Sequence, residues 1–251
     1  MIVSHKHKFI FVKNRKVGGT SMEVALAKIC GPDDILSSDV PERGRVGRND
    51  VLAAHARNYE GGFNVFGEMK LDMRPGSVAR VLRDRLQRHR YYSHMRAASI
   101  KARIGAQVWD SYYTFCFERN PWDKMISFYY WYNRLNQDPV DINTFICGKM
   151  AGRTVDQKYP TDWDRYTLQD RIITDDVFDF SDLSGNLATA LGRAGVAPEI
   201  IASLELPRAK THTRAKEPEK LTKASDAVVR KVFANEIRQF GYTPPEGLTG
   251  A

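Results

Sequence analysis

Residues 8–30 contain an apolar run, a glycine-containing turn and an amphipathic stretch, one directly after the other. KFIFVK (8–13) is typical of a buried strand, and the stretch that Thr20 opens, SMEVALAKIC, has the apolar spacing of a helix ending at Gly31. The turn NRKVGG lies between them. This order of strand, loop and helix predicts the first unit of an α/β protein.

The remaining sequence continues the same pattern. Strands are expected at 112–117 and 177–180, and helices at 96–104, from Asn120-Pro121 onward, and at 141–149, 183–195 and 223–240. Residues 37–80 are rich in Gly, Arg, Asn and Asp and predict long loops with short elements. We find no repeat or linker in the sequence, so the 251 residues (1–251) are expected to form a single domain.

The charge of the chain indicates an anionic partner. Lys and Arg number 38 against 30 Asp and Glu, a formal net charge of +8. Such a surplus suits nucleic acid, anionic lipid or a phosphorylated or sulfated small molecule, although scattered arginines also form ordinary solvated faces. The three cysteines lack CxxC spacing, and the polar, basic N-terminal stretch is no signal peptide, so we expect a cytoplasmic protein without a metal site.

The first motif with chemical content is KVGGTS (16–21), between the first strand and the first helix. Gly18 and Gly19 let an anion approach the main-chain amides, and Thr20 and Ser21 lie at the positive end of the helix dipole. Lys16 adds a point charge. The Walker pattern GxxxxGK[ST] is not met, because the lysine precedes the glycines. The alternative interpretation is a basic turn without a ligand.

The second motif is FERNPWDKMISFYYW (117–131). It places Arg119 at the end of a strand and Ser127 about two turns into the following helix. Arginine suits bidentate phosphate binding, and the serine hydroxyl can reach the same anion. The alternative is a capped helix in which Arg119 pairs with a carboxylate and Ser127 faces solvent.

Together, KxGGTS and RNPxxKxxSxYY resemble the two binding signatures for 3′-phosphoadenosine 5′-phosphosulfate (PAPS) in the sulfotransferase family, in its carbohydrate-sulfotransferase branch with many bacterial members. The resemblance implies that the first motif contacts the 5′-phosphosulfate through Lys16, Gly18, Gly19, Thr20 and Ser21. It implies that Arg119 and Ser127 hold the 3′-phosphate. Lys124 departs from the family, which usually has a second arginine there.

The resemblance extends to VFDFSDLSGNLATALGRAGV (177–196) and to LPRAKTHTR (206–214), which is similar to a loop that covers the cofactor. It thereby adds Lys210, Thr211 and Arg214 as candidate cofactor contacts. The implied fold is α/β, a P-loop-like three-layer fold with a central, mainly parallel sheet flanked by helices.

A histidine is the usual proton acceptor near neutral pH, and the chain has six. His94 is the leading candidate, since relatives that modify carbohydrates carry a histidine in a similar place that acts as the catalytic base. A structural histidine at a helix cap is the alternative. His55 and the carboxylates Glu23, Glu60 and Asp110 stay open as bases.

The sequence therefore predicts a sulfotransferase that moves a sulfuryl group from PAPS to an acceptor hydroxyl and releases 3′-phosphoadenosine 5′-phosphate (PAP). His94 is the expected base, and Lys16 is expected to stabilise the leaving phosphate. The acceptor is expected to be a small molecule or glycan, polar or anionic, with a carbohydrate or glycolipid leading and a small metabolite or peptide tyrosine as the alternative. Trp163 and Tyr166 either stack on sugar rings or pack locally. No nucleic-acid partner and no stable membrane insertion are expected. A P-loop kinase-like phosphotransferase, or a non-catalytic nucleotide- or nucleic-acid-binding protein, is the alternative.

Overall fold

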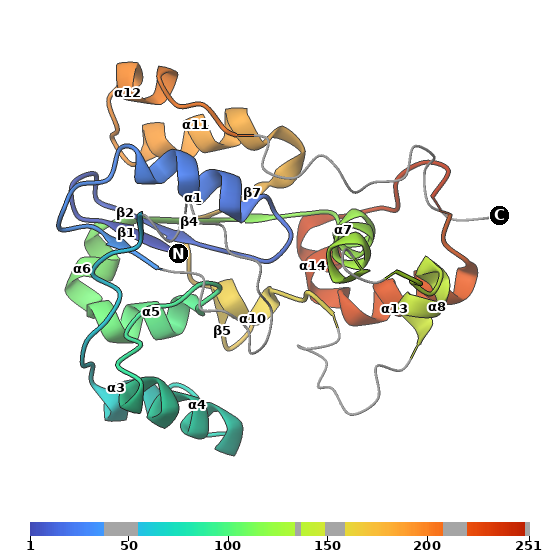
Figure 1. Cartoon of the computed structure of the whole chain (residues 1–251), viewed down its shortest axis with the longest axis horizontal. Coiled ribbons are helices and arrows are strands. Elements are labelled where there is room, and N and C mark those ends of the chain that lie inside the picture. The colour runs from blue at the N-terminus through green and yellow to red at the C-terminus, as the bar shows by residue number, and fades with distance from the viewer. Residues whose placement is uncertain (38–54, 134–136, 149–158, 208–219, 249–251) are drawn as a thin grey trace.

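The computed structural model describes residues 1–37, 55–133, 137–148, 159–207 and 220–248 (Figure 1). Within them, a sheet of five strands runs in the order β3-β1-β2-β4-β7. The strands are β1 (Ile2–Ser4), β2 (Phe9–Val12), β3 (Ile35–Leu36), β4 (Tyr113–Glu118) and β7 (Asp176–Asp179). The pairs β2–β4 and β4–β7 are parallel, whereas β1 is antiparallel to both β2 and β3. The chain is α/β as predicted, but the sheet is mixed, because the two antiparallel pairings equal the two parallel ones.

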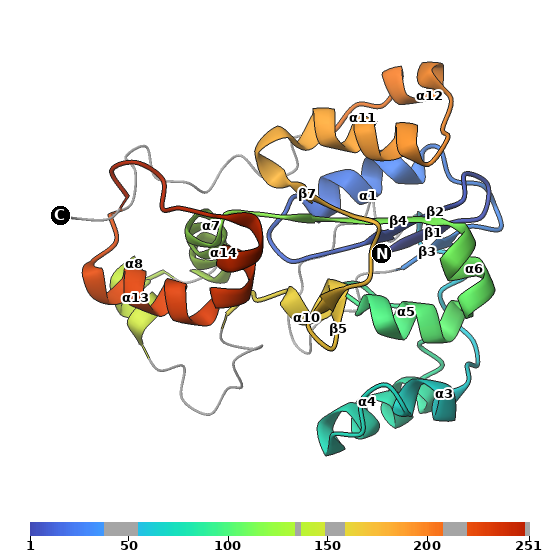
Figure 2. The same cartoon turned by 180° about the vertical axis from the view of Figure 1, so that it is seen from behind.

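Helices cover both faces of this sheet (Figures 1 and 2). One face carries α1 (Gly19–Ala27), α11 (Leu183–Arg193) and α12 (Pro198–Ala202). The opposite face carries α5 (Ala97–Ile104), α6 (Ala106–Ser111), α10 (Trp163–Tyr166) and the small hairpin β5 (Thr167–Leu168) and β6 (Arg171–Ile172). A helical group beside the sheet consists of α7 (Pro121–Asn133), α8 (Ile142–Cys147), α13 (Lys223–Val232) and α14 (Ala234–Phe240). Beyond α5 lie α3 (Val65–Met69) and α4 (Pro75–Leu86).

The sheet is buried on both faces because its side chains alternate between two cores. Phe9 and Phe11 of β2 join the core under α1 and α11, whereas Ile10 and Val12 join the core on the α5 side. Such strands read as continuous apolar runs. This explains why the sequence pattern identified β2 and β4 correctly.

The predicted strands at 8–13, 112–117 and 177–180 are confirmed, as are the helices at 96–104 and 183–195. The helix expected at 223–240 is two helices, because the main chain leaves helical geometry at Phe233 (φ −107°, ψ 29°). The expectation of short elements in 37–80 was wrong for α4, which begins at Pro75 and runs for 12 residues. Its inward face includes Asp84 as well as Val81, so the sequence lacks a continuous apolar stripe there.

Candidate functional site

The two sequence motifs meet at one edge of the sheet. Because β2, β4 and β7 are parallel, their carboxyl ends lie together, and ligands of open α/β sheets bind at this edge. Residues 13–18, which follow β2, form a loop that we call the 13–18 loop. Asn14 Nδ2 donates to the carbonyl of Phe117 at the end of β4 over 2.9 Å, so the loop that leads into the first motif is joined to the start of the second.

The 13–18 loop requires glycine at its junction with α1. Gly18 is the N-cap of α1 with φ 71°, in the left-handed region. A Cβ added at Gly18 would lie 3.1 Å from Leu183 Cδ2, and one at Gly19 would lie 2.8 Å from Lys13 Cγ. Gly18 has no side chain that could cap the helix. The first main-chain N–H groups of α1 therefore have no side-chain cap from Gly18 and are of the kind that binds anions at helix N-termini.

Lys16 connects this loop to α7. Its φ is 61°, and its Nζ lies 5.4 Å from the centroid of the Trp131 ring. Ser127 precedes Trp131 by four residues in the same helix, so both side chains share one face of α7. The ammonium of the first motif and the half-buried hydroxyl of the second therefore lie beside the same helix face.

Arg119 links the motifs most directly. Its Nη1 donates to the carbonyl of Lys16 over 2.8 Å, and its guanidinium lies 4.3 Å from the ring centroid of Phe180. Its Nε also pairs with Asp123 Oδ2 over 2.6 Å, and the side chain is 8 % exposed. The carboxylate pairing considered as an alternative is thus present, and it coexists with the contact to the loop. Asn120 caps α7 as predicted, because its Oδ1 accepts from the N–H of Trp122 over 3.2 Å.

His94 contacts the other end of the same loop. Its Nδ1 lies 3.2 Å from the carbonyl oxygen of Lys13. A carbonyl only accepts, so neutral His94 carries its hydrogen on Nδ1 and keeps the lone pair of Nε2. Burial lowers the pKa of His94 well below 6.5, and the charges of Lys13 and Arg165 lower it further while Asp162 opposes them. The ring is therefore neutral at pH 7, the form that a general base needs.

The alternative carboxylate bases have other partners. Glu23 is 3 % exposed and binds Lys13 Nζ over 2.6 Å. Asp110 pairs with Lys101 over 2.7 Å on the exposed side of α6. Glu60 forms a β-bridge with His89. Glu23 thus reaches the 13–18 loop only as the ion-pair partner of a lysine.

His55, His5 and His7 occupy other surroundings than His94. His55 is half-buried and lines a small cavity with Glu23 and Leu36. His5 and His7 precede β2, at the opposite end of the strand from the 13–18 loop. Their rings contact Tyr112 Oη and the carbonyl of Ile29.

A buried carboxylate that the sequence analysis missed, Asp162, binds the 13–18 loop through Arg15. Asp162 is fully buried and accepts from both the main-chain N–H and the Nε of Arg15, over 2.8 and 2.9 Å. It also binds Lys124 Nζ at 2.7 Å and Arg165 Nε at 2.7 Å. Burial opposes ionisation, but Lys124 and the two arginines hold the pKa of Asp162 below its ordinary value. No local pattern marks Asp162, since it lies 147 residues from Arg15.

Lys124, the departure from the family pattern, is part of this buried network. It is fully buried and binds Glu118 Oε1 at 2.6 Å as well as Asp162. Asp162 and Glu118 raise the pKa of Lys124 above its ordinary value although burial acts in the opposite direction. Lys124 therefore supports the strand end and the loop from within the protein.

The expected ring stacking by Tyr166 is wrong. Tyr166 is fully buried and donates its hydroxyl to Glu118 Oε2 over 3.2 Å. Trp163 is half-buried, and its Nε1 donates to Asp170 over 3.0 Å.

Three of the predicted cofactor contacts, Lys210, Thr211 and Arg214, lie outside the described residues. Within the described part of the chain, no three His, Cys, Asp or Glu side chains gather as a metal ion would require. None of the described helices has both the length and the apolar character needed to cross a bilayer.

Comparison with known proteins gives a single short similarity and no family. No family model matches the chain, and no solved structure matches it. An uncharacterized protein of Archaeoglobus fulgidus is 46 % identical over 44 residues, which are 18 % of this chain and 37 % of that protein. The chain thus covers well under half of the length of this relative.

Proposed function

We propose that the chain is a PAPS-dependent sulfotransferase. One observation carries the proposal: the 13–18 loop is contacted at both ends by the groups that this chemistry needs. His94 Nδ1 lies at the carbonyl of Lys13, and Arg119 Nη1 lies at the carbonyl of Lys16. A neutral histidine and an arginine thus contact a glycine-containing loop that carries a lysine and leads into a helix.

The residues of this edge fit the phosphosulfate end of PAPS. The main-chain amides at the start of α1 and the hydroxyls of Thr20 and Ser21 would accept an anion, with Lys16 beside them. A Cβ at Gly18 or Gly19 would crowd its neighbours, so both positions require glycine for the loop to keep this shape. When bound, PAPS supplies the sulfuryl group, and PAP is its leaving part. Lys16 would then stabilise the negative charge that develops on the leaving phosphate.

For Arg119 to bind the 3′-phosphate, the phosphate must replace Asp123 as its ion-pair partner. Arg119 is paired with Asp123 over 2.6 Å, and its side chain is mostly buried. Asp123 is 29 % exposed, so its carboxylate can turn to solvent when a phosphate replaces it. Ser127, on the α7 face that also carries Trp131, would add its hydroxyl to the same phosphate.

His94 would take the proton from the acceptor. Its Nδ1 is occupied by the carbonyl of Lys13, so Nε2 is the atom that accepts. In-line transfer needs the acceptor oxygen opposite the leaving phosphate, as in phosphoryl transfer. The anchoring of His94 to the loop that follows β2 supports this role, because it ties the base to the residues around the leaving group.

For the acceptor, we propose a hydroxyl of a carbohydrate or glycolipid that carries negative charge. Arg15 and Arg165 support an anionic acceptor, because both contribute positive charge to the surroundings of His94. Both are partly exposed, at 20 % and 16 %, while Asp162 fixes their positions. The half-buried Trp163, next to Asp162 in the chain, would contribute an aromatic edge to such a site.

The finer fold, a P-loop-like arrangement, belongs to the same proposal. The unit of β2, the 13–18 loop and α1 supports it, as does the parallel pairing of β2 with β4. The antiparallel β1 and β3 extend the sheet on one side of this unit.

Calorimetric titration with PAP, run beside ATP with magnesium, tests the proposal. We expect binding in the micromolar range for PAP, weaker binding for ATP and loss of PAP binding in Arg119→Ala. Arg193→Ala, which changes an exposed arginine paired with Asp176, is the matched control. A preference for ATP would contradict the proposal and favour a kinase-like phosphotransferase, and equal failure of both nucleotides would also contradict it.

A further inference from the structure

Exposed apolar side chains are concentrated in one small part of the molecule. Residues 61–90, which we call the α3–α4 unit, contain α3 and α4 and lie beyond α5, away from the sheet (Figures 1 and 2). Among the described residues, six large apolar side chains are strongly exposed, and Val140 is the one outside this unit. The five within it are Phe66 (77 %), Leu71 (37 %), Met73 (72 %), Leu82 (46 %) and Leu86 (84 %). Single exposed apolar residues are ordinary, but such a concentration indicates a contact surface.

The outer side of α4 is itself ordered as an apolar stripe. Ala79, Leu82 and Leu86 follow one another at helical spacing and are exposed, whereas Val81 and Asp84 face inward. The stripe spans roughly 10 Å along the helix, from the rise of about 1.5 Å per residue. Helix α4 thus presents an apolar line to solvent in addition to the face that packs on the protein.

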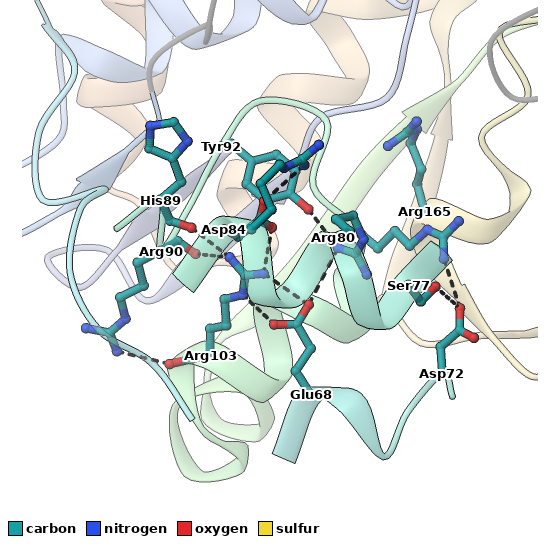
Figure 3. Close-up of polar contacts among 12 residues, drawn as sticks. Glu68, Asp72, Ser77, Arg80, Asp84, His89, Arg90, Tyr92, Arg103 and Arg165 are labelled. Carbon is teal, nitrogen blue, oxygen red and sulfur yellow. Dashed lines mark hydrogen bonds and ion pairs between the residues drawn. The ribbon is translucent and has the colours of Figure 1, made fainter. Parts of the chain in front are cut away.

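Two of the three negative charges of the unit are buried, and the third, Asp72, is 22 % exposed and ion-paired (Figure 3). Glu68 and Asp84 are each 2 % exposed and share the buried guanidinium of Arg103, at 2.6 and 3.0 Å. Asp72 binds Arg74 at 2.6 Å and accepts from Ser77. All three carboxylates of residues 61–90 are therefore held by partners within the protein.

The positive charges are turned outward. Residues 61–90, all of which the structure describes, contain seven Lys and Arg against these three carboxylates, so their net charge of +4 is half of the +8 of the chain. Five of the cations are exposed: Lys70, Arg74, Arg83, Arg85 and Arg88. The outer surface of the unit thus combines apolar side chains with cations, of which Arg74 pairs with the partly exposed Asp72 and Arg83 with the buried Asp84.

We propose that this outer surface of the α3–α4 unit docks on an anionic lipid bilayer. A bilayer interface takes both kinds of side chain, because apolar groups enter the boundary of the acyl chains while arginines bind the headgroup phosphates. Nucleic acid would bind the arginines but leave Leu82, Leu86 and Met73 in water. A second copy of this unit would cover the apolar groups but bring like charges together. The proposal does not depend on sulfuryl transfer, since none of these residues belongs to the 13–18 loop or its contacts.

Sedimentation with vesicles tests the proposal. We expect the full chain to sediment with vesicles that contain about 30 mol % phosphatidylserine and to remain in solution with pure phosphatidylcholine, at about 0.1 M NaCl. Leu82→Ser with Leu86→Ser, and separately Arg83→Glu with Arg85→Glu, should each lower the vesicle partition coefficient at least about tenfold. The four side chains are exposed, and Asp84, which Arg83 binds at 3.0 Å, keeps its ion pair with the buried Arg103, so the variants should retain the circular dichroism and melting temperature of the wild type.

Matched controls separate this surface from general charge and apolarity. Lys231→Glu with Arg238→Glu changes the charge equally at exposed positions of α13 and α14, and Val140→Ser removes the exposed apolar residue outside the unit; both should bind like the wild type. Equal loss in the charge control, or unchanged binding in the leucine variant, would overturn the proposal. The proposal would also be overturned if the wild type formed a dimer that Leu82→Ser with Leu86→Ser abolishes and did not bind vesicles. Stronger binding to duplex DNA than to vesicles, at equal phosphate concentration, would overturn it as well.

Discussion

Arg119 Nη1 donates to the main-chain carbonyl of Lys16 across 2.8 Å, which joins the loop after β2 to the strand end of β4. The same guanidinium is paired with Asp123 at 2.6 Å. One arginine thus fixes the shape of the loop and is also the strongest candidate to bind a phosphate. The part that the ion pair plays in phosphate binding can be tested by changing Arg119 and Asp123 one at a time.

The pairing with Asp123 predicts opposite effects for two substitutions. Arg119→Ala should weaken PAP binding by about 2–4 kcal/mol, since a mostly buried charged contact is lost. Asp123→Asn removes the competing carboxylate but leaves Arg119 in place, so PAP should bind at least as tightly as in the wild type. Calorimetry with PAP measures both. Weaker binding in Asp123→Asn would show that the ion pair orients Arg119 for the phosphate and does not compete with it.

Lys16 should affect turnover more than affinity. Its charge is expected at the leaving phosphate, where negative charge grows during transfer, so Lys16→Ala should lower kcat by about 100-fold or more. PAP affinity should fall by less than about tenfold, because the α1 amides and Arg119 remain. Assays with PAPS and a panel of sugar acceptors, beside PAP calorimetry, provide the two numbers. Equal losses in both would assign Lys16 to binding alone.

His94 should be neutral over most of the physiological range. Burial, together with Lys13 and Arg165, lowers the pKa of His94 well below 6.5, so the acid limb of kcat/KM should lie below pH 6.5. His94→Ala should reduce kcat by about 100-fold or more if Nε2 takes the acceptor proton. The ring can be titrated by NMR, with His94→Ala to assign its resonance. Titration at or above pH 6.5 would contradict the lowered pKa of His94, and turnover of the variant within a few-fold of the wild type would exclude His94 as this base.

The glycine that begins α1, directly after the 13–18 loop, can be tested by stability as well as by binding. Gly19→Ala places a Cβ 2.8 Å from Lys13 Cγ, and Lys13 cannot move without disturbing its buried pair with Glu23. We expect a loss of roughly 1–3 kcal/mol in the free energy of unfolding and weaker PAP binding. Gly192→Ala is the control: its added Cβ meets nothing within 4 Å in α11, so it should stabilise by about 0.5–1 kcal/mol. Urea unfolding of both variants decides the question, and similar stabilities would contradict the crowding at Gly19.

The sequence predicted the parts of the site that are local and missed the parts that are assembled over long distances. The 13–18 loop and the start of α7 were recognised because glycine, proline and capping residues act within a few positions. The anchor of the loop, Asp162, lies 147 residues from Arg15 and shows no spacing pattern. From the sequence, Lys124 was interpreted as a substitute for a phosphate-binding arginine. A lysine in a buried ion pair and a lysine that binds phosphate cannot be told apart by residue type, and the structure places Lys124 in ion pairs with Glu118 and Asp162. Helix α4 was not predicted because its inner face contains a carboxylate and its outer face contains leucines, so its sequence lacks the usual amphipathic pattern.

A buried carboxylate next to this network should make stability depend on pH. Glu236 of α14 is 2 % exposed, and its Oε1 has no hydrogen-bond partner among the described residues. Burial, reinforced by the charge of Glu118 and opposed by Lys124, raises the pKa of Glu236 to about 7. The folded state therefore keeps this proton between pH 4.5 and 7, where the unfolded chain loses it. The stabilisation is complete below about pH 4.5 and is lost as the pH rises through 7.

Glu236→Gln removes this dependence while it keeps the shape of the side chain. Relative to the variant, the wild type should lose roughly 3 kcal/mol in the free energy of unfolding between pH 4.5 and pH 8, which follows from a shift of about 2.5 pH units. Urea unfolding at several pH values measures the difference curve. Glu246→Gln changes an exposed carboxylate and is the matched control. The difference in the free energy of unfolding between the wild type and Glu236→Gln could instead stay constant over this range. Glu236 would then be ionised in the folded protein, and Lys124 would neutralise it together with Glu118 and Asp162.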